Sequence, residues 1–348
     1  MGTPTDRGPA DRILISTHEV CLLHDPGLYH PERASRLTAV CQGIEVSGVQ
    51  DAVDFVEAPT VPTEALTAVH PASLLVRLEE MSRTGGGAID ADTGVSEGSA
   101  EAARRAAGAG LDLIDRLERG EGSVGWSVVR PPGHHATATR QMGFCLVNNV
   151  AVAARALASR GERVVVVDVD AHHGNGTQDI FYRDGNVLFI SFHQWPWYPF
   201  SGAAGEIGEG DGRYATVNIP VPSGATGDVY RTGIEQVVAP VLATFEPTWM
   251  LVSLGFDGHR DDPLTELGLT SGDFGDIVFD LLQFVPAGRR LMFLEGGYDL
   301  RALKNSTAAV LSAVAGERAR PEKATSGGPG DGAVEDARRI HVEHQLDG

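Results

Sequence analysis

Residues 164–176 read VVVVDVDAHHGNG and contain the strongest indication of this chain's fold. The four consecutive valines form an apolar, β-branched run, which is typical of a strand buried on both faces within a parallel sheet. In open α/β sheets, ligands bind beyond the carboxyl ends of the strands. We therefore interpret the acids and histidines that follow the valines as half of a metal site. These residues are Asp168, Asp170, His172 and His173.

Apolar strands and helices alternate through the rest of the chain, which indicates an α/β fold. We predict one domain over residues 12–316, with a central, mostly parallel sheet flanked by helices on both faces. The expected strands are 12–17, 126–130, 163–168, 187–192, 215–219, 250–254 and 290–294. The expected helices are 35–46, 71–83, 96–118, 149–160, 228–245, 271–284 and 300–315. Residues 317–348 are rich in Gly, Pro, Ser and mixed charge, which predicts a disordered tail.

The composition limits the classes of protein to consider. Of the 348 residues, 42% are hydrophobic and 22% are charged, and no apolar run approaches the ~20 residues that span a bilayer. The N-terminal residues lack the apolar segment of an export signal. The three cysteines are odd in number and not in CxxC spacing, which argues against disulfides and a cysteine zinc site. We expect a cytoplasmic protein that does not contact membranes.

The net charge of −19 disfavours direct binding of nucleic acid, because an acidic surface repels phosphate. The same field attracts cationic substrates such as lysine-rich peptides or polyamines, although solubility alone accounts for most of the charge. The sequence leaves open whether the chain forms a homo-oligomer.

Polar residues follow four separate apolar strands, and the carboxyl ends of parallel strands lie on one edge of a sheet. A lone polar residue at a strand end is ordinarily a helix cap or a turn former, but four strands with this feature favour a shared site. The four groups are His134 with His135, Asp168 to His173, Asp257 with His259, and Glu295 to Tyr298.

Asp170 and His172 stand two residues apart, so their side chains point the same way on an extended segment. Asp257 approaches from another strand end. Two carboxylates and one imidazole leave a position for water, as in a catalytic rather than a structural zinc site. Zn²⁺ or Fe²⁺ suits this ligand set, whereas Mg²⁺ takes more oxygen ligands.

The competing hypothesis is a two-metal site of the arginase type, which needs one Asp two residues after His172 and another two residues before Asp257. Gly174 and Gly255 occupy those positions, so we predict a single metal ion. We then expect Asp168 either to hold a structural monovalent ion together with Ser191 or to orient a histidine.

His134 and His135 follow a rigid Pro-Pro pair and suit proton transfer, because histidine titrates near neutral pH. Tyr298 comes directly after two glycines and is expected to donate a hydrogen bond to a developing oxyanion.

Together, these motifs resemble the zinc-dependent histone deacetylase and acetylpolyamine amidohydrolase superfamily, which has the arginase/deacetylase α/β fold. The resemblance spans about residues 12–316. It rests on RPPGHHA at 130–136, GFC at 143–145, DVDAHHG at 168–174, SLGFD at 253–257 and EGGY at 295–298. The stretches HGNG at 173–176 and EIGEG at 206–210 are more similar to class II and bacterial members than to class I.

The resemblance implies roles for the matching residues. The implied zinc ligands are Asp170, His172 and Asp257, and the implied catalytic residues are His135 as general base, His134 as its electrostatic assistant and Tyr298 as the donor to the acetyl carbonyl. Potassium would be held by Asp168 and Ser191 with the carbonyl groups of Asp170, His172 and Phe192.

The resemblance also implies a substrate tunnel. Phe144 and Tyr198 would wall it, and Gly143 would offer its carbonyl to the substrate amide. Asp92 would grip the substrate at the rim, and Arg33 would lie near an internal acetate channel.

Two positions depart from the expected pattern. Asn175 stands where class I members have an acid that partners the histidine pair, and Leu264 stands where a polyamine-specialised member has a glutamate. The implied activity is zinc-dependent removal of acyl groups from amines, with acyl-lysine of proteins or peptides as the expected substrate. The alternatives are an acetylpolyamine amidohydrolase and a catalytically silent metal-binding scaffold.

Overall fold

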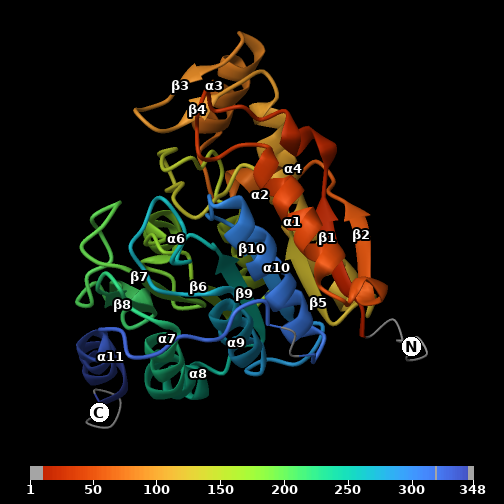
Figure 1. Ribbon diagram of the computed structural model, residues 1–348. Helices are drawn as coiled ribbons and strands as arrows, with labels where there is room; N and C mark the ends of the chain where they lie inside the picture. Colours follow the sequence, from red (N-terminus) through yellow and green to blue (C-terminus); the bar gives the residue numbers. More distant parts are fainter. Residues whose placement is uncertain (1–10, 318–319, 344–348) are drawn as a thin grey trace.

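The computed structural model describes residues 11–317 and 320–343. Its main sheet has eight strands in the order β2-β1-β5-β10-β9-β6-β7-β8, and every pairing in this sheet is parallel (Figure 1). The strands are β1 (Ile13–Thr17), β2 (Val53–Glu57), β5 (Val124–Ser127), β6 (Val164–Asp168), β7 (Val187–Gln194), β8 (Thr216–Val221), β9 (Trp249–Leu254) and β10 (Arg290–Leu294). A separate antiparallel pair joins β3 (Gly87–Ala88) and β4 (Gly94–Val95). The predicted α/β class with a central parallel sheet is confirmed.

Helices cover both faces of the sheet. They are α1 (Ser35–Val46), α2 (Thr63–Thr67), α3 (Ala72–Arg83), α4 (Ser99–Glu118), α5 (Asn149–Ala158), α6 (Asn175–Phe181), α7 (Gly227–Gly233), α8 (Ala239–Phe245), α9 (Ser271–Leu282), α10 (Leu300–Val314) and α11 (Asp331–Arg338). Among the described residues, no helix combines the length and the apolar character needed to span a bilayer.

The valines of β6 explain why this strand is central. Successive side chains of a strand point to opposite faces. Val164 and Val166 pack into a core shared with α4 and α5, whereas Val165 and Val167 pack into the core shared with α1, α9 and α10. All four valines are fully buried, as their apolar run predicted.

Most predicted helices and strands are found within a few residues of their expected bounds. The helix expected at 228–245 consists of α7, a π-helical turn at Ile234–Val238, and α8. The strand expected at 126–130 starts earlier, as β5. The sequence pattern does not reveal β2, α2 or α6, because an edge strand with exposed alternate residues and helices of five and seven residues are too short for a clear period.

The structure contradicts the predicted disorder over residues 320–343. Residues 331–338 form α11, a π-helical turn follows at Arg339–Glu343, and α11 lies beside β8 at the edge of the molecule (Figure 1). Val334 and Ala337 are buried in the same core as Val217 of β8. Two small apolar side chains are a weak signal in sequence, but they suffice here because the sheet edge supplies a partner surface. Residues 318–319 and 344–348 of the predicted tail lie outside the described residues.

Candidate metal centre and active site

The polar residues predicted at four strand ends come together because the preceding strands are neighbours. β5, β10, β9 and β6 are adjacent in this order and parallel, so their carboxyl ends form one edge. Asp168 is the last residue of β6, while Asp257 and Glu295 follow closely after β9 and β10. His134 and His135 follow β5 after residues 128–133.

Asp170, His172 and Asp257 form a compact, buried cluster at this edge. Nδ1 of His172 lies 3.2 Å from Oδ1 of Asp170 and 3.0 Å from Oδ2 of Asp257. The ligand atoms of all three residues lie within 4.8 Å of one another. This spacing suits one ion with ligands about 2.0–2.2 Å away, and the donor set suits zinc or iron(II). The residues therefore fit the single metal ion that the sequence predicts.

Glycines and backbone amides hold the two carboxylates. The Gly296 amide donates to Oδ2 of Asp170 at 2.7 Å, and the Ala171 amide donates to Oδ1 of Asp257 at 2.8 Å. A Cβ atom at Gly296 would overlap both carboxylates, and one at Gly255 would overlap that of Asp170. Gly255, which replaces the second carboxylate of a two-metal site, thus also makes room for the carboxylate that is present.

The charges of the cluster depend on one another. Burial lowers the pKa of His172, but Asp257 and Asp170 outweigh this effect and raise it to about 10. Burial raises the pKa of Asp257, and the charge of Asp170 adds to the rise. Two buried acids around one imidazole concentrate negative charge that a bound cation would neutralise.

His134 lies behind the cluster and is oriented by Asp168. Its Nδ1 donates to Oδ2 of Asp168 at 2.9 Å, and its Nε2 lies 3.9 Å from Oδ1 of Asp170. Burial lowers the pKa of His134, but these two carboxylates outweigh it and raise the pKa well above its ordinary value. The two carboxylates therefore favour the protonated form of His134.

His135 has the opposite character. Its Nδ1 lies 2.7 Å from Oδ1 of Asn175. Because an amide oxygen only accepts, the hydrogen-bond network assigns the ring proton to Nδ1 and leaves Nε2 as the basic nitrogen. Burial lowers the pKa of His135 well below its ordinary value, and the positive charge of His134 lowers it further. His135 is therefore neutral and able to accept a proton.

Gly143 packs its backbone against the ring of His135. The residue has a φ of +57°, and a Cβ atom there would lie 2.5 Å from Cδ2 of His135. Both the left-handed conformation and the close approach require glycine. The next residue, Phe144, donates its amide to Oγ1 of Thr93 at 3.2 Å, and this hydroxyl donates to Oδ1 of Asp92 at 2.9 Å. The predicted rim residue Asp92 is thereby tied to the predicted tunnel wall.

The other predicted substrate-binding residues also lie around the histidines. The ring centroid of Tyr198 is 5.4 Å from that of His135, and the ring centroid of Phe144 is 5.7 Å from that of Tyr298. The Leu264 carbonyl accepts a hydrogen bond at 3.0 Å from Nε1 of Trp197, the residue that precedes Tyr198.

Tyr298 keeps its phenolic proton at neutral pH, because burial raises its pKa well above the ordinary value. The guanidinium of Arg36 lies 5.0 Å from the centre of the Tyr298 ring. The Tyr298 amide donates to Oδ2 of Asp262 at 2.7 Å. Burial raises the pKa of Asp262 to about 7. The sequence suggests a role for Asp262 only as part of an acidic loop suited to a cationic substrate, because nothing local links its carboxylate to Tyr298.

Arg33, predicted near an internal channel, is instead exposed. The buried arginine is Arg36, which donates to the carbonyl oxygens of Gly297, at 2.6 Å, and of Glu295. Arg36 also pairs with Glu32 at 3.1 Å, one helical turn earlier in sequence. Opposite charges at this spacing are equally typical of an exposed helix face, so the sequence holds no local signal that Arg36 is buried.

Asp168 and Ser191, predicted to hold potassium, are direct partners in the pairing of β6 with β7. Burial raises the pKa of Asp168 to about 6. The Ser191 hydroxyl lies 2.9 Å from Nδ1 of His193. The side chain of Phe192 stacks on Tyr230, with ring centroids 5.0 Å apart, so only its carbonyl is left for an ion.

His173 is held away from the metal cluster. Its Nδ1 lies 2.8 Å from Oγ of Ser201, and its Nε2 lies 3.0 Å from Oε1 of Gln178. Burial lowers its pKa to about 3. Both ring nitrogens have protein partners, so the structure leaves His173 no role as a ligand in the metal cluster.

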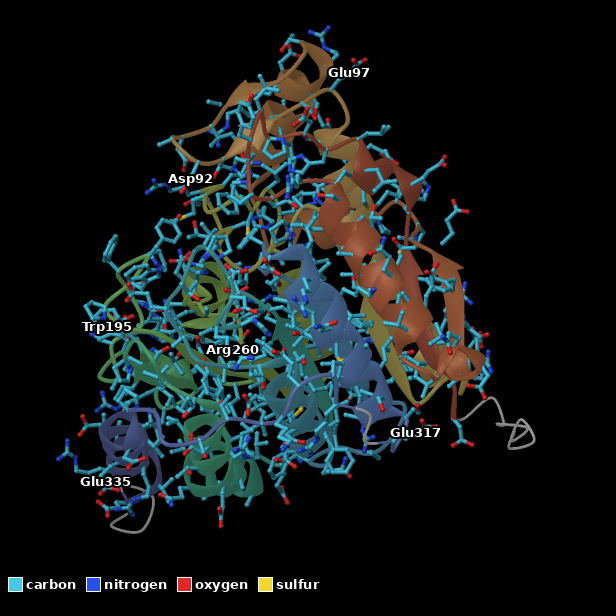
Figure 2. All side chains as sticks on the ribbon, viewed as in Figure 1. Asp92, Glu97, Trp195, Arg260, Glu317 and Glu335 are labelled. Atoms are coloured by element: carbon cyan, nitrogen blue, oxygen red, sulfur yellow. The ribbon has the colours of Figure 1, made fainter. Side chains whose placement is uncertain are left out.

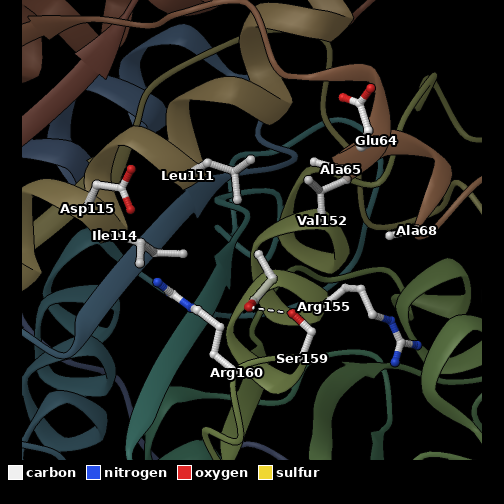
Figure 3. Close-up of a pocket in the computed structure, with 11 residues that line it drawn as sticks. Glu64, Ala65, Ala68, Leu111, Ile114, Asp115, Val152, Arg155, Ser159 and Arg160 are labelled. Carbon is white, nitrogen blue, oxygen red and sulfur yellow. Dashed lines mark hydrogen bonds between the residues drawn. The ribbon is translucent and has the colours of Figure 1, made fainter.

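Two hollows differ in their relation to the cluster. A cavity of about 460 Å³ between α2, α4 and α5 has Leu111, Ile114 and Val152 among its lining residues and contains none of the predicted site residues (Figure 3). A second hollow of about 660 Å³ includes in its wall Asn175, the residue that contacts Nδ1 of His135.

Comparison with known proteins points to one family. The family model described as the histone deacetylase domain matches residues 30–314. The chain is 36% identical over 309 residues to a probable deacetylase of Archaeoglobus fulgidus, covering 87% of this chain and 86% of the relative. It is 38% identical over 295 residues to a histone deacetylase-like amidohydrolase of Pseudomonas aeruginosa, covering 83% and 77%.

A solved structure is also similar. The crystal structure of the HDA15 HD domain superposes with a TM-score of 0.88 at 34% identity, and the match covers 97% of this chain and 96% of that one. From the family match, the identities and the shared fold, the chain belongs to the histone deacetylase domain family.

Proposed function

We propose that the protein is a zinc-dependent amidohydrolase that removes acetyl or other acyl groups from lysine side chains of proteins or peptides. One observation carries the proposal: the imidazole of His135, whose Nδ1 is engaged by Asn175, lies beside the metal cluster, with its ring centroid 6.0 Å from that of His172. The protonated hydroxyl of Tyr298 supplies a hydrogen-bond donor in the same site. The names of the Archaeoglobus and Pseudomonas relatives support the reaction class.

The side chains divide the reaction between them. Zinc held by Asp170, His172 and Asp257 would supply a water molecule of lowered pKa and polarise the acyl carbonyl. His135 would take the proton of that water on Nε2, while Asn175 keeps Nδ1 protonated. Tyr298 would donate its hydroxyl proton in a hydrogen bond to the carbonyl oxygen as negative charge develops there. The water oxygen would bond to the acyl carbon, and the carbon–nitrogen bond would break as His135 passes its proton to the leaving amine, so that acetate and a free amine result.

The surroundings of Leu264 support a peptide substrate over a polyamine. Its carbonyl is engaged by Trp197 and its amide by Asp262, so the backbone of this apolar residue is fixed between a neighbour of Tyr198 and the support of Tyr298. An apolar side chain offers no partner for the second ammonium group of a polyamine. Asp92 at the rim would instead accept hydrogen bonds from the backbone amides of an extended peptide.

We further propose that Asp168 and Ser191 help to hold a structural potassium ion. We also propose that residues 12–316 form the catalytic domain and that the enzyme works in the cytoplasm. The pairing of Asp168 with Ser191 supports the first proposal. The three free cysteines support a reducing compartment.

The test is a comparison of turnover on an acetyl-lysine peptide, N-acetylputrescine and N-acetylspermidine, with and without a chelator. We expect the peptide to have the highest kcat/KM and chelation to abolish the reaction. His135→Ala and Tyr298→Phe should each retain zinc yet lose almost all turnover; removing an oxyanion donor typically costs about 10²–10³ in rate. Faster turnover of the polyamines would favour the alternative substrate, and zinc binding without any turnover would favour a silent scaffold.

A further inference from the structure

The segment that links α10 to α11 forms a strap, defined here as residues 320–330, outside the stretch matched by the family model. In Figure 1 it runs as a blue trace past α9 and α7 toward α11. Its residue Glu322 lies against the loop that follows β9, which carries the metal-cluster residue Asp257. This contact joins a segment without any predicted role to the active site.

The carboxylate of Glu322 is fully engaged. Its Oε2 lies 2.8 Å from Nε2 of His259 and accepts from the amide and hydroxyl of Ser271 at 3.2 and 3.0 Å. Its Oε1 accepts from the guanidinium of Arg260 at 2.8 Å. His259 itself is 1% exposed, so Glu322 is the anchor of a buried imidazole.

His259 in turn shapes the turn formed by residues 256–262. Its Nδ1 accepts from the Asp261 amide at 3.2 Å, so Nε2 carries the proton and donates to Glu322. Its own amide donates to the Phe256 carbonyl at 3.1 Å, and its carbonyl accepts from the Asp262 amide at 2.8 Å. The ring of His259 therefore fastens the turn to the strap.

Both ends of this turn serve the candidate active site. Asp257 contributes a carboxylate to the metal cluster, and Asp262 accepts from the amides of Tyr298 and Asp299 at 2.7 and 3.2 Å. A shift of the turn would consequently move a metal ligand and the support of the oxyanion donor at the same time. Misplacing reacting groups by about 1 Å can cost about 10²-fold in rate.

A metal ion is not the better explanation for this group. His259, Asp261 and Glu322 have ligand atoms within 4.8 Å of one another. The Arg260 guanidinium, however, already pairs with the Glu322 carboxylate and would repel a cation. The arrangement is that of a hydrogen-bonded anchor.

We propose that Glu322 is a positioning residue: through His259 it fixes the 256–262 turn, so that Asp257 and Tyr298 are held for metal binding and catalysis. The inference rests on the proposed function for its catalytic consequence, but its effect on metal affinity does not depend on the substrate.

The strap has other attachments, so a substitution at Glu322 leaves it in place. Thr325 donates its amide and hydroxyl to Asp273, the Gly327 amide donates to Asp228, and the Gly328 amide donates to Thr226. This makes Glu322→Ala a local test. Glu322→Gln keeps an oxygen acceptor for His259, and Glu335→Ala on the exposed face of α11 removes a surface partner of Arg338 as a matched control (Figure 2).

The experiment measures the zinc dissociation constant by competition with a chromophoric chelator, kcat and KM on an acetyl-lysine peptide, and the melting temperature of each zinc-loaded variant. Residues that orient metal ligands typically contribute about 10–100-fold in metal affinity or activity. For Glu322→Ala we expect about tenfold weaker zinc binding and about tenfold lower kcat, with KM within about twofold of wild type. Glu322→Gln should recover most of both losses, and Glu335→Ala should change neither.

A double substitution tests the route through His259. If Glu322 acts through that ring, His259→Ala combined with Glu322→Ala should bind zinc no more weakly than His259→Ala alone. Wild-type zinc affinity and kcat in Glu322→Ala would overturn the inference whatever the melting temperature, as would equal losses in Glu335→Ala or additive losses in the double variant. If the wild-type protein binds zinc but does not deacetylate, the proposed function fails while the zinc measurements still decide the role of Glu322.

Discussion

The Oδ1 atom of Asn175 lies 2.7 Å from Nδ1 of His135, and the side-chain nitrogen Nδ2 of Asn175 lies 3.5 Å from Sδ of Met142. The candidate general base is thus supported by a neutral amide instead of a carboxylate. The Asn175 amide oxygen raises the pKa of His135 through its hydrogen bond, but burial and the charge of His134 outweigh it; a carboxylate would stabilise the imidazolium more strongly. This pairing therefore favours a His135 that is neutral over a wide pH range.

The substitution Asn175→Asp should make His135 more basic. A carboxylate beside Nδ1 stabilises the protonated ring and raises its pKa, by about 1–3 units for a close opposite charge. Because the base works only when it is neutral, the acidic limb of the kcat/KM profile should move to higher pH by about one unit or more. Profiles from pH 5 to 9 for the wild type and Asn175→Asp measure this shift. An acidic limb that stays in place would show that His135 is not the titrating base.

Gly296→Ala should disrupt the metal cluster. The added Cβ would overlap the carboxylates of Asp170 and Asp257, which cannot move far because backbone amides hold them. We expect a loss of zinc affinity of about 100-fold, at the upper end of what misplaced ligand supports cause. Gly205→Ala is the matched control, since a Cβ there meets nothing within 4 Å. Equal zinc affinities of the two variants, measured by chelator competition, would contradict the structure of the cluster.

Leu264→Glu should shift the substrate preference toward polyamines. A carboxylate at this half-buried position beside Trp197 could pair with the distal ammonium of N-acetylspermidine. Exposed ion pairs contribute about 0.2–1 kcal/mol, so kcat/KM for N-acetylspermidine should rise about 1.4- to fivefold relative to an acetyl-lysine peptide. Leu264→Gln controls for the change in shape and polarity. A preference that changes equally in both variants would mean that charge at this position does not select the substrate.

The predicted helices and strands that pack against a continuous core were recoverable from sequence. The four valines of β6 and the bounds of α1 are examples, because an apolar run and a helical period record burial directly. The grouping of Asp170, His172 and Asp257 was also predictable, since parallel strands bring their carboxyl ends to one edge.

Contacts that depend on tertiary packing were not recoverable. Arg36 rather than Arg33 faces Tyr298, and both are arginines near the start of α1. The strap is rich in Gly, Pro and Ser. Hydrogen bonds to side chains such as those of Asp273 and Asp228, and not apolar packing, fix its position. The composition of the strap therefore indicates disorder, although the folded protein orders it through hydrogen bonds to residues that are distant in sequence.

The stability of α11 and the turn at Arg339–Glu343 should depend on pH through His341. This residue is buried, its Nε2 has no hydrogen-bond partner among the described residues, and burial lowers its pKa to about 4. An unfolded histidine titrates near pH 6.5, so between these values the unfolded chain binds a proton that the folded chain does not. Its contribution to stability is therefore present above pH 6.5 and is lost as the pH falls toward 4.

The expected loss is about 2 kcal/mol of unfolding free energy between pH 7 and pH 5. Denaturant unfolding of the wild type and His341→Leu at both pH values measures it, and hydrogen exchange of the α11 amides locates it. The variant should lose less stability than the wild type over this range. Identical pH dependence in the two proteins would mean that His341 is accessible to protons in the folded state.

The single-metal deacetylase site is tested most directly by adding zinc to chelator-treated protein while acetate release from an acetyl-lysine peptide is followed. Activity should be absent at the start, rise linearly and reach its maximum at one zinc per chain, and Asp257→Ala should stay inactive throughout. Full turnover before zinc is added, or a rise that continues to two zinc ions per chain, would contradict a single catalytic ion bound by Asp170, His172 and Asp257.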